Sequence, residues 1–149
     1  MSRAQGEPLR IAVLISGGGT TLRNILESID QGRLNARVVL VVSSTAEAGG
    51  LAYAREAGVR VEVVQRSESA SLDQFTERVF MPCREAEAEL VVMGGFLKHV
   101  LIPADFENRV INIHPSLIPA YCGKGFYGHR VHEAVLEAGE ATSGCTIHF

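Results

Sequence analysis

Arg10 to Leu22 reads RIAVLISGGGTTL, an apolar run that stops at three consecutive glycines and continues into polar residues. The part from Arg10 to Ser16 is rich in aliphatic side chains and predicts a buried parallel strand. From Thr20 to about Asp30, Leu and Ile recur at helical spacing, and Thr20 or Thr21 is placed to cap the helix. This part of the sequence therefore predicts a strand, a glycine turn and a helix.

The same alternation continues along the rest of the chain. Further strands are predicted at 36–43, 59–64, 90–93 and 110–113, with another beginning at 145–149, and helices at 46–57, 72–88 and 129–137. Strands and helices that alternate at this spacing predict right-handed crossovers and a sheet covered on both faces. We therefore expect an α/β fold, a Rossmann-like open, mostly parallel sheet with helices on both faces. Residues 1–149 are expected to form one domain, with a flexible tail at 1–9.

The composition excludes several classes of protein. The formal net charge of −3 argues against a broad surface for nucleic acid, which needs a basic stripe. The apolar runs are too short to cross a bilayer, which takes about 20 residues. Residues 1–9 carry no apolar core of a signal peptide, so a cytoplasmic protein is expected, without membrane or nucleic-acid partners.

Cysteine and histidine spacing gives no sign of a metal site. Cys83, Cys122 and Cys145 are odd in number and form no C-x-x-C pair, so they predict neither a disulfide framework nor a zinc site. His129 and His132 lie three residues apart on a predicted helix, but no third ligand accompanies them. We expect no metal.

The glycine turn at 17–19 presents backbone N–H groups beside the positive end of a helix dipole, which suits a phosphate. A dinucleotide site requires the motif G-x-G-x-x-G and an acidic residue at the end of the second strand. Here the second strand ends in Ser43-Ser44-Thr45, so neither requirement is met well. A turn that binds nothing and a nicotinamide-dependent dehydrogenase remain alternatives. The favoured prediction is a single phosphate held by N–H groups and hydroxyls of Gly18, Gly19, Thr20 and Thr21.

Residues 111–119 read INIHPSLIP and end a predicted strand in polar side chains. Alternate side chains of a strand share a face, so Asn112 and His114 are expected to point the same way. An amide stabilises a developing oxyanion, and an imidazole transfers protons near neutral pH. The pair therefore suits acyl chemistry, and a structural histidine is the alternative.

Four segments together resemble the phosphoribosylglycinamide formyltransferases: SGGGTTL at 16–22, GGFLK at 94–98, INIHPSLIP at 111–119 and GCTIHF at 144–149. The resemblance implies transfer of a formyl group from the co-substrate 10-formyltetrahydrofolate to the amine of glycinamide ribonucleotide, in purine biosynthesis and without a metal. It implies that Asn112 and His114 are the catalytic amide and imidazole. It also implies a phosphate site at Gly19, Thr20 and Thr21, a folate pocket at Leu97, Lys98, His99, Val100 and Asn112, and supporting roles for His132 and His148.

The resemblance also leaves questions open. The family places an essential aspartate a few residues beyond the position of Phe149, so we expect the natural sequence to continue past it. A basic residue that helps hold the folate in some members has no counterpart around Leu72, and the resemblance offers Arg66 as a candidate substitute.

Three alternatives to this transfer reaction remain, beside the dehydrogenase named above. Formyltetrahydrofolate deformylases share the Asn-x-His pattern but have a His where Pro115 stands, and methionyl-tRNA formyltransferases add a C-terminal domain and bind RNA. A non-catalytic nucleotide-binding module is the alternative from a different class. The sequence leaves a monomer or a homodimer open.

Overall fold

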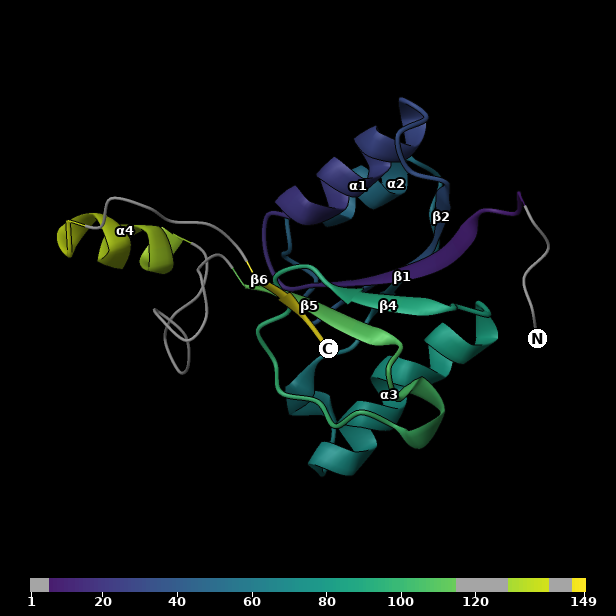
Figure 1. The fold of residues 1–149 in the computed structure, drawn as a ribbon. Coiled ribbons are helices and arrows are strands. Elements are labelled where there is room, and N and C mark those ends of the chain that lie inside the picture. The colour runs from purple at the N-terminus through teal and green to yellow at the C-terminus, as the bar shows by residue number, and fades with distance from the viewer. Residues whose placement is uncertain (1–5, 115–128, 140–145) are drawn as a thin grey trace.

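The computed structural model describes residues 6–114, 129–139 and 146–149. They build a six-stranded sheet in the order β3-β2-β1-β4-β5-β6, with α1, α2 and α3 packed on it and α4 apart from it (Figure 1). In chain order the elements are β1 (Leu9–Ile15), α1 (Thr20–Asp30), β2 (Ala36–Ser43), α2 (Leu51–Glu56), β3 (Val61–Val63), the 3-10 turn Arg66–Glu68, α3 (Leu72–Glu85), β4 (Leu90–Met93), the 3-10 turn Ala104–Phe106, β5 (Val110–His114), α4 (His129–Glu137) and β6 (Thr146–His148).

The first five strands run parallel, and β6 pairs antiparallel with β5. The predicted open, mostly parallel sheet is therefore confirmed. In the centre of the sheet, β1 lies between β2 and β4. Because the parallel strands share one direction, the loops that follow β1, β2, β3 and β4 and the end of β5 all meet at one edge. We call this the carboxyl edge.

The core has two layers, one on each face of the sheet. Ile11, Val13 and Ile15 of β1 pack with residues of α1 and α2 on one face. Ala12 and Leu14 pack with α3 on the other face. Figure 1 shows α1 and α2 on one side of the sheet and α3 on the opposite side. The strand β1 is thus buried on both faces, as its continuous apolar run predicts.

The cap of α1 and the bounds of several elements differ from the prediction, among them β3, which spans Val61–Val63 and not 59–64. The cap of α1 is Gly19, with φ 71°, and no side chain caps the helix, so neither Thr20 nor Thr21 does. The helix α2 begins at Leu51 and not at 46, because the loop after β2 packs through Gly50 against the glycine turn. The helix α3 ends at Glu85, since the chain turns there to reach β4.

Two glycine loops touch at the carboxyl edge. A Cβ atom built on Gly19 would lie 2.5 Å from the Gly50 Cα, and one built on Gly50 would lie 2.8 Å from the Gly19 Cα and 2.9 Å from Ile15 Cδ1. The Gly50 N–H also donates to the Gly17 carbonyl oxygen at 3.0 Å. The loop after β2 therefore packs directly against the glycine turn (Gly17–Gly19), backbone against backbone.

No helix among the residues described here combines the length and the apolar character that a bilayer crossing requires.

The contact between the two glycine loops makes a stability prediction. Gly50→Ala should lower the free energy of unfolding by about 1–3 kcal/mol, because the new methyl group overlaps backbone that cannot rotate away. Gly49→Ala is the matched control, since its methyl group would meet only the Gly18 Cα, at an ordinary 3.7 Å. Urea unfolding of both variants measures the difference, and equal losses would contradict the packing argument.

Candidate active site

The glycine turn lies at the start of α1 and exposes its first two residues. Gly17, Gly18 and Thr20 are exposed, whereas Gly19 is buried against the loop after β2. Because no side chain caps α1, its first backbone N–H groups face the space beyond the carboxyl edge. An anion is stabilised at such a helix start by these N–H groups and by the helix dipole.

Thr21 is half-buried and lies against the loop after β4. A Cβ atom on Gly94 would lie 3.2 Å from the Thr21 Cβ and 3.3 Å from its methyl carbon. Gly94 therefore allows α1 to approach β4 closely. This packing uses the methyl side of Thr21, so the predicted phosphate site draws on its backbone N–H and hydroxyl.

Ser16 joins three loops of the carboxyl edge. Its Oγ lies 2.6 Å from the Ser44 Oγ and accepts a hydrogen bond from the Leu97 N–H at 2.9 Å. Its own N–H donates to the Gly95 carbonyl oxygen at 3.1 Å. Ser44, which follows β2 where a dinucleotide site carries an acid, is buried in this contact. The polar end of β2 thus holds loops together and offers no carboxylate to a ribose.

Asn112 lies on the face of the sheet that α3 covers. Its neighbours Ile111 and Ile113 pack on the opposite face, and strand side chains alternate. Asn112 is paired with Met93 of β4 and with His148 of β6. Its Nδ2 lies 3.3 Å from the His148 Nε2. The structure therefore brings together Asn112 and one of the two histidines predicted to support it.

The contacts of His148 define its tautomer. The Asn112 amide nitrogen can only donate, so the His148 Nε2 accepts. The other ring nitrogen, Nδ1, lies 3.1 Å from the Phe149 carbonyl oxygen, which can only accept. Both contacts are satisfied by the tautomer that carries its proton on Nδ1 and accepts at Nε2. His148 in this form orients the amide of Asn112.

The other two histidines predicted at the site, His114 and His132, are not shown in contact with Asn112. The structure describes the backbone of His114 at the end of β5, but its side chain lies outside the described residues, as do Pro115 and Pro119. His132 is exposed on α4, which lies beyond β6 in Figure 1. The predicted convergence of the Asn112 and His114 side chains therefore stays a prediction.

The predicted folate segment (Leu97–Val100) follows β4. Leu97, Lys98 and His99 are exposed, whereas Val100 is buried in the core beneath α3. A cavity of about 360 Å³ opens beside this segment, lined by Ser16, Ser44, Thr45, Gln65, Arg66, Ser67, Leu97 and Lys98. The segment therefore forms one wall of a polar cavity at the carboxyl edge.

This cavity carries two positive charges. Arg66 donates to the Ser69 carbonyl oxygen at 2.9 Å and lies 5.9 Å over the Phe75 ring. Neither contact neutralises its charge. The ion pairs within the described ranges include neither Arg66 nor Lys98. A ligand with carboxylates fits this wall of the site.

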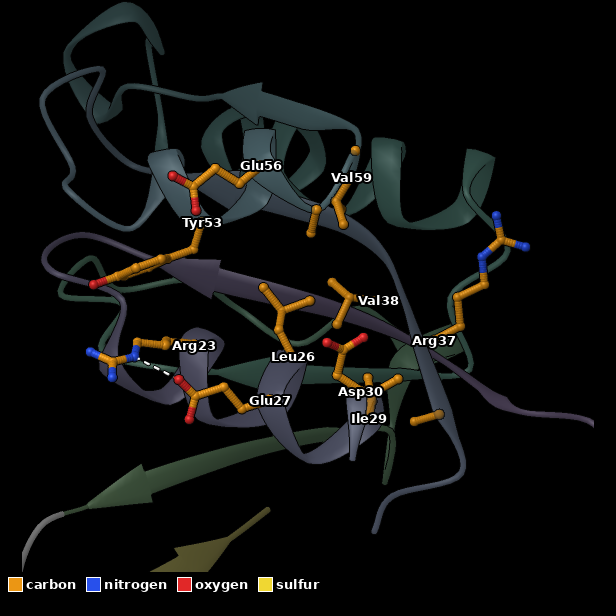
Figure 2. Close-up of a pocket in the computed structure, with 13 residues that line it drawn as sticks. Arg23, Leu26, Glu27, Ile29, Asp30, Arg37, Val38, Tyr53, Glu56 and Val59 are labelled. Carbon is orange, nitrogen blue, oxygen red and sulfur yellow. Dashed lines mark hydrogen bonds and ion pairs between the residues drawn. The ribbon is translucent and has the colours of Figure 1, made fainter. Parts of the chain in front are cut away.

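A larger groove, of about 740 Å³, lies between α1 and α2 at the opposite end of the strands. Figure 2 shows Arg23 and Glu27 at its rim, joined by an ion pair of 2.9 Å. Its lining runs along α1 to Ala36 at the start of β2 and includes neither Asn112 nor a residue of the glycine turn. Ligands of open α/β sheets bind at the carboxyl ends of the strands, and the smaller cavity is there.

Two other chemistries find no support among the described residues. No group of three His, Cys, Asp or Glu side chains gathers there as metal ligands. Cys83 is buried, and this burial raises the pKa of its thiol to about 12. The Cys83 thiol is therefore no nucleophile. Cys122 and Cys145 lie outside the described residues.

Sequence reasoning missed the hydroxyl groups that hold these loops. Ser16 and Thr76 accept hydrogen bonds from the loop after β4, and Ser44 contacts Ser16. Ser44 and Thr76 belong to none of the four motif segments, and the side chain of Ser16 was assigned no role in its segment. The sequence does contain one indication of the Thr76 contact, because Thr76 is a polar residue on the apolar face of α3, beside Phe75. A buried hydroxyl needs a partner, and such a position predicts a tertiary hydrogen bond.

Comparison with known proteins gives the family. The family model described as formyl transferase matches residues 9–149. The chloroplastic phosphoribosylglycinamide formyltransferase of Arabidopsis thaliana is 41% identical over 150 residues, which covers 96% of this chain and 51% of the relative. The phosphoribosylglycinamide formyltransferase of Haemophilus influenzae is 33% identical, and the match covers 94% of this chain and 65% of that protein. The chain thus spans about half the length of the plant relative.

Solved structures agree with this result. Glycinamide ribonucleotide transformylase 1 from Symbiobacterium toebii superposes with a TM-score of 0.85 at 36% identity, over 97% of this chain and 67% of that one. The phosphoribosylglycinamide formyltransferase from Brucella melitensis gives a TM-score of 0.83 at 31% identity, over 96% of this chain and 73% of that one. On its sequence and on its fold, this chain belongs to the formyl transferase family.

Proposed function

We propose that the protein transfers the formyl group of 10-formyltetrahydrofolate to the amine of glycinamide ribonucleotide, a step of purine biosynthesis. The observation that carries this proposal is the position of Asn112. It stands at the end of β5 on the face covered by α3, with its amide held by His148. An amide that is held in place at the carboxyl edge of the sheet suits the stabilisation of an oxyanion.

The ribonucleotide is proposed to bind from the glycine turn toward Asn112. Leu14 of β1, Met93 of β4 and Asn112 of β5 are aligned by the pairing of the strands. Two strand spacings separate β1 from β5, which is about 10 Å. A phosphorylated ribose with a short amide arm is long enough to bridge this distance. Its phosphate takes the N–H groups at the start of α1, from Gly18, Gly19, Thr20 and Thr21.

The folate is proposed to bind beside the folate segment, on the face of the sheet that α3 covers. Phe96 and Val100 are buried in the core of that face, so the exposed backbone between them is fixed in place. Arg66 and Lys98 line the cavity beside it and suit the carboxylates of a folate. The formyl group then meets the substrate amine near Asn112.

The proposed reaction is a direct transfer. The substrate amine attacks the formyl carbon, and a bond from this nitrogen to carbon forms while the carbonyl oxygen gains negative charge. Asn112 and a protonated His114 stabilise that oxyanion. The bond from the formyl carbon to the folate nitrogen then breaks, and the proton of the incoming nitrogen moves to the leaving nitrogen. The products are the formylated ribonucleotide and tetrahydrofolate, with no covalent enzyme intermediate.

A cytoplasmic location and a monomeric or homodimeric state stay predictions. Two plant relatives carry chloroplastic names, so the compartment differs among relatives. The proposed partners are the two small-molecule substrates alone.

The proposed function predicts that activity depends on the ribonucleotide. The product of the complete gene should release tetrahydrofolate from 10-formyltetrahydrofolate only when glycinamide ribonucleotide is present, because the attacking amine belongs to that substrate. Absorbance of the released folate measures the rate. Release without the ribonucleotide would indicate a deformylase. Transfer to methionyl-tRNA would indicate the tRNA enzyme, and binding without release would indicate a non-catalytic module.

The second prediction concerns Asn112. Asn112→Ala should lower kcat about 10²–10³-fold, the usual cost of removing one donor to an oxyanion. Asn35→Ala is the matched control, since Asn35 is exposed before β2 and distant from the carboxyl edge. Steady-state kinetics and thermal unfolding of both variants separate chemistry from folding. A kcat for Asn112→Ala within threefold of the parent would refute its proposed role.

A further inference from the structure

The loop after β4 is held at two points by side-chain hydroxyls from other elements. The Leu97 N–H donates to the Ser16 Oγ at 2.9 Å, and the Leu101 N–H donates to the Thr76 Oγ1 at 3.0 Å. Ser16 is 81 residues away in sequence and Thr76 is 25 residues away. These two contacts bracket the folate segment, one at its first residue and one just beyond its last.

Buried aromatic and aliphatic side chains fix the same loop from the core. The Phe96 ring stacks on the Phe75 ring, with centroids 6.4 Å apart and planes inclined by 8°. Phe96 and Val100 are each 8% exposed, whereas Leu97 is 53% exposed. The loop is thus anchored in the core before and at the end of the folate segment, while the backbone between these anchors faces outward.

Three consecutive backbone N–H groups lie between the two hydroxyl contacts. Those of Lys98, His99 and Val100 donate to no group among the described residues. An N–H group next to a ligand cavity and without a protein partner is available to an acceptor on the ligand. A folate offers such acceptors in its ring nitrogens, its carbonyl oxygens and its carboxylates.

The Thr76 hydroxyl accepts the hydrogen bond from the Leu101 N–H. It is 6% exposed on α3, and no buried side-chain nitrogen or oxygen in the described part of the chain lacks a partner. Valine has nearly the same shape, so Thr76→Val keeps the packing and removes the acceptor of the Leu101 N–H. Ser16 is a less selective probe, because it also contacts Ser44 and directly precedes the glycine turn.

We propose that Thr76, together with Ser16, is a positioning residue for the folate. The two hydroxyls set the backbone of the folate segment so that the N–H groups of Lys98, His99 and Val100 meet acceptors of 10-formyltetrahydrofolate. This inference rests on the proposed function and assigns the geometry of its folate site to side chains outside that site. Thr76 touches neither substrate, so its loss weakens folate binding and leaves the chemical step intact.

The test compares Thr76→Val with Thr76→Ser in the product of the complete gene. Thr76→Val should raise the KM for 10-formyltetrahydrofolate about tenfold, the effect of losing one hydrogen bond that positions the segment. The KM for glycinamide ribonucleotide and kcat should stay within twofold. Thr76→Ser keeps the acceptor and should return the folate KM to within twofold of the parent, although it removes a buried methyl group.

The outcomes separate positioning from stability. An unchanged folate KM in Thr76→Val overturns the proposal. So does an equal rise of the folate KM in Thr76→Ser, because a general loss of packing would then explain both variants. If the parent protein performs no transfer, the proposed function fails, and the same three proteins are compared by their Kd for tetrahydrofolate from fluorescence titration. A Kd ratio near one, or no binding by the parent, then overturns the positioning role as well.

Discussion

Parallel strands must all end at the same edge of their sheet, and this constraint determines where every functional group of the chain lies. Five strands share one direction, so the glycine turn, the loop after β4 and the end of β5 are neighbours although nearly a hundred residues separate the first from the last. The order of the strands sets their spacing, with β4 between β1 and β5. The place of a candidate ligand site at this edge therefore follows from topology before any side chain is considered.

The two faces of the sheet present different groups at this edge. The start of α1 lies on one face and suits a phosphate, while the loop after β4 and Asn112 lie toward the face of α3 and suit the formyl donor. Ser16 stands at the boundary, since its side chain holds the loop after β4 and its backbone leads into the glycine turn. In the proposed reaction, an amine and a formyl carbon held from opposite faces would meet between them, which would lower the entropic part of the barrier.

Much of this arrangement could be predicted from the sequence, and the limits have physical causes. Apolar runs that stop at glycine or at polar residues predicted the strands and the edge at which they end, because burial on both faces demands such runs. The prediction of the α1 cap was wrong. Thr20 and Thr21 have the right chemistry for a cap, but the residue at that position is Gly19, which takes a left-handed conformation. Hydroxyl contacts such as Thr76 to Leu101 escaped prediction because they join residues that only the packed fold brings together.

The contact between Gly19 and Gly50 has a consequence for how this chain tolerates change over evolutionary time. Each glycine occupies the space that a side chain on the other would need, and the two belong to loops that follow different strands. Substitution at either position requires the loops to part, which would shift the start of α1. The two positions therefore cannot drift independently, and an insertion in the loop after β2 is tolerated only where it leaves this contact intact. Sequence variation at this edge should accumulate elsewhere, in exposed positions such as Ala46 and Glu47.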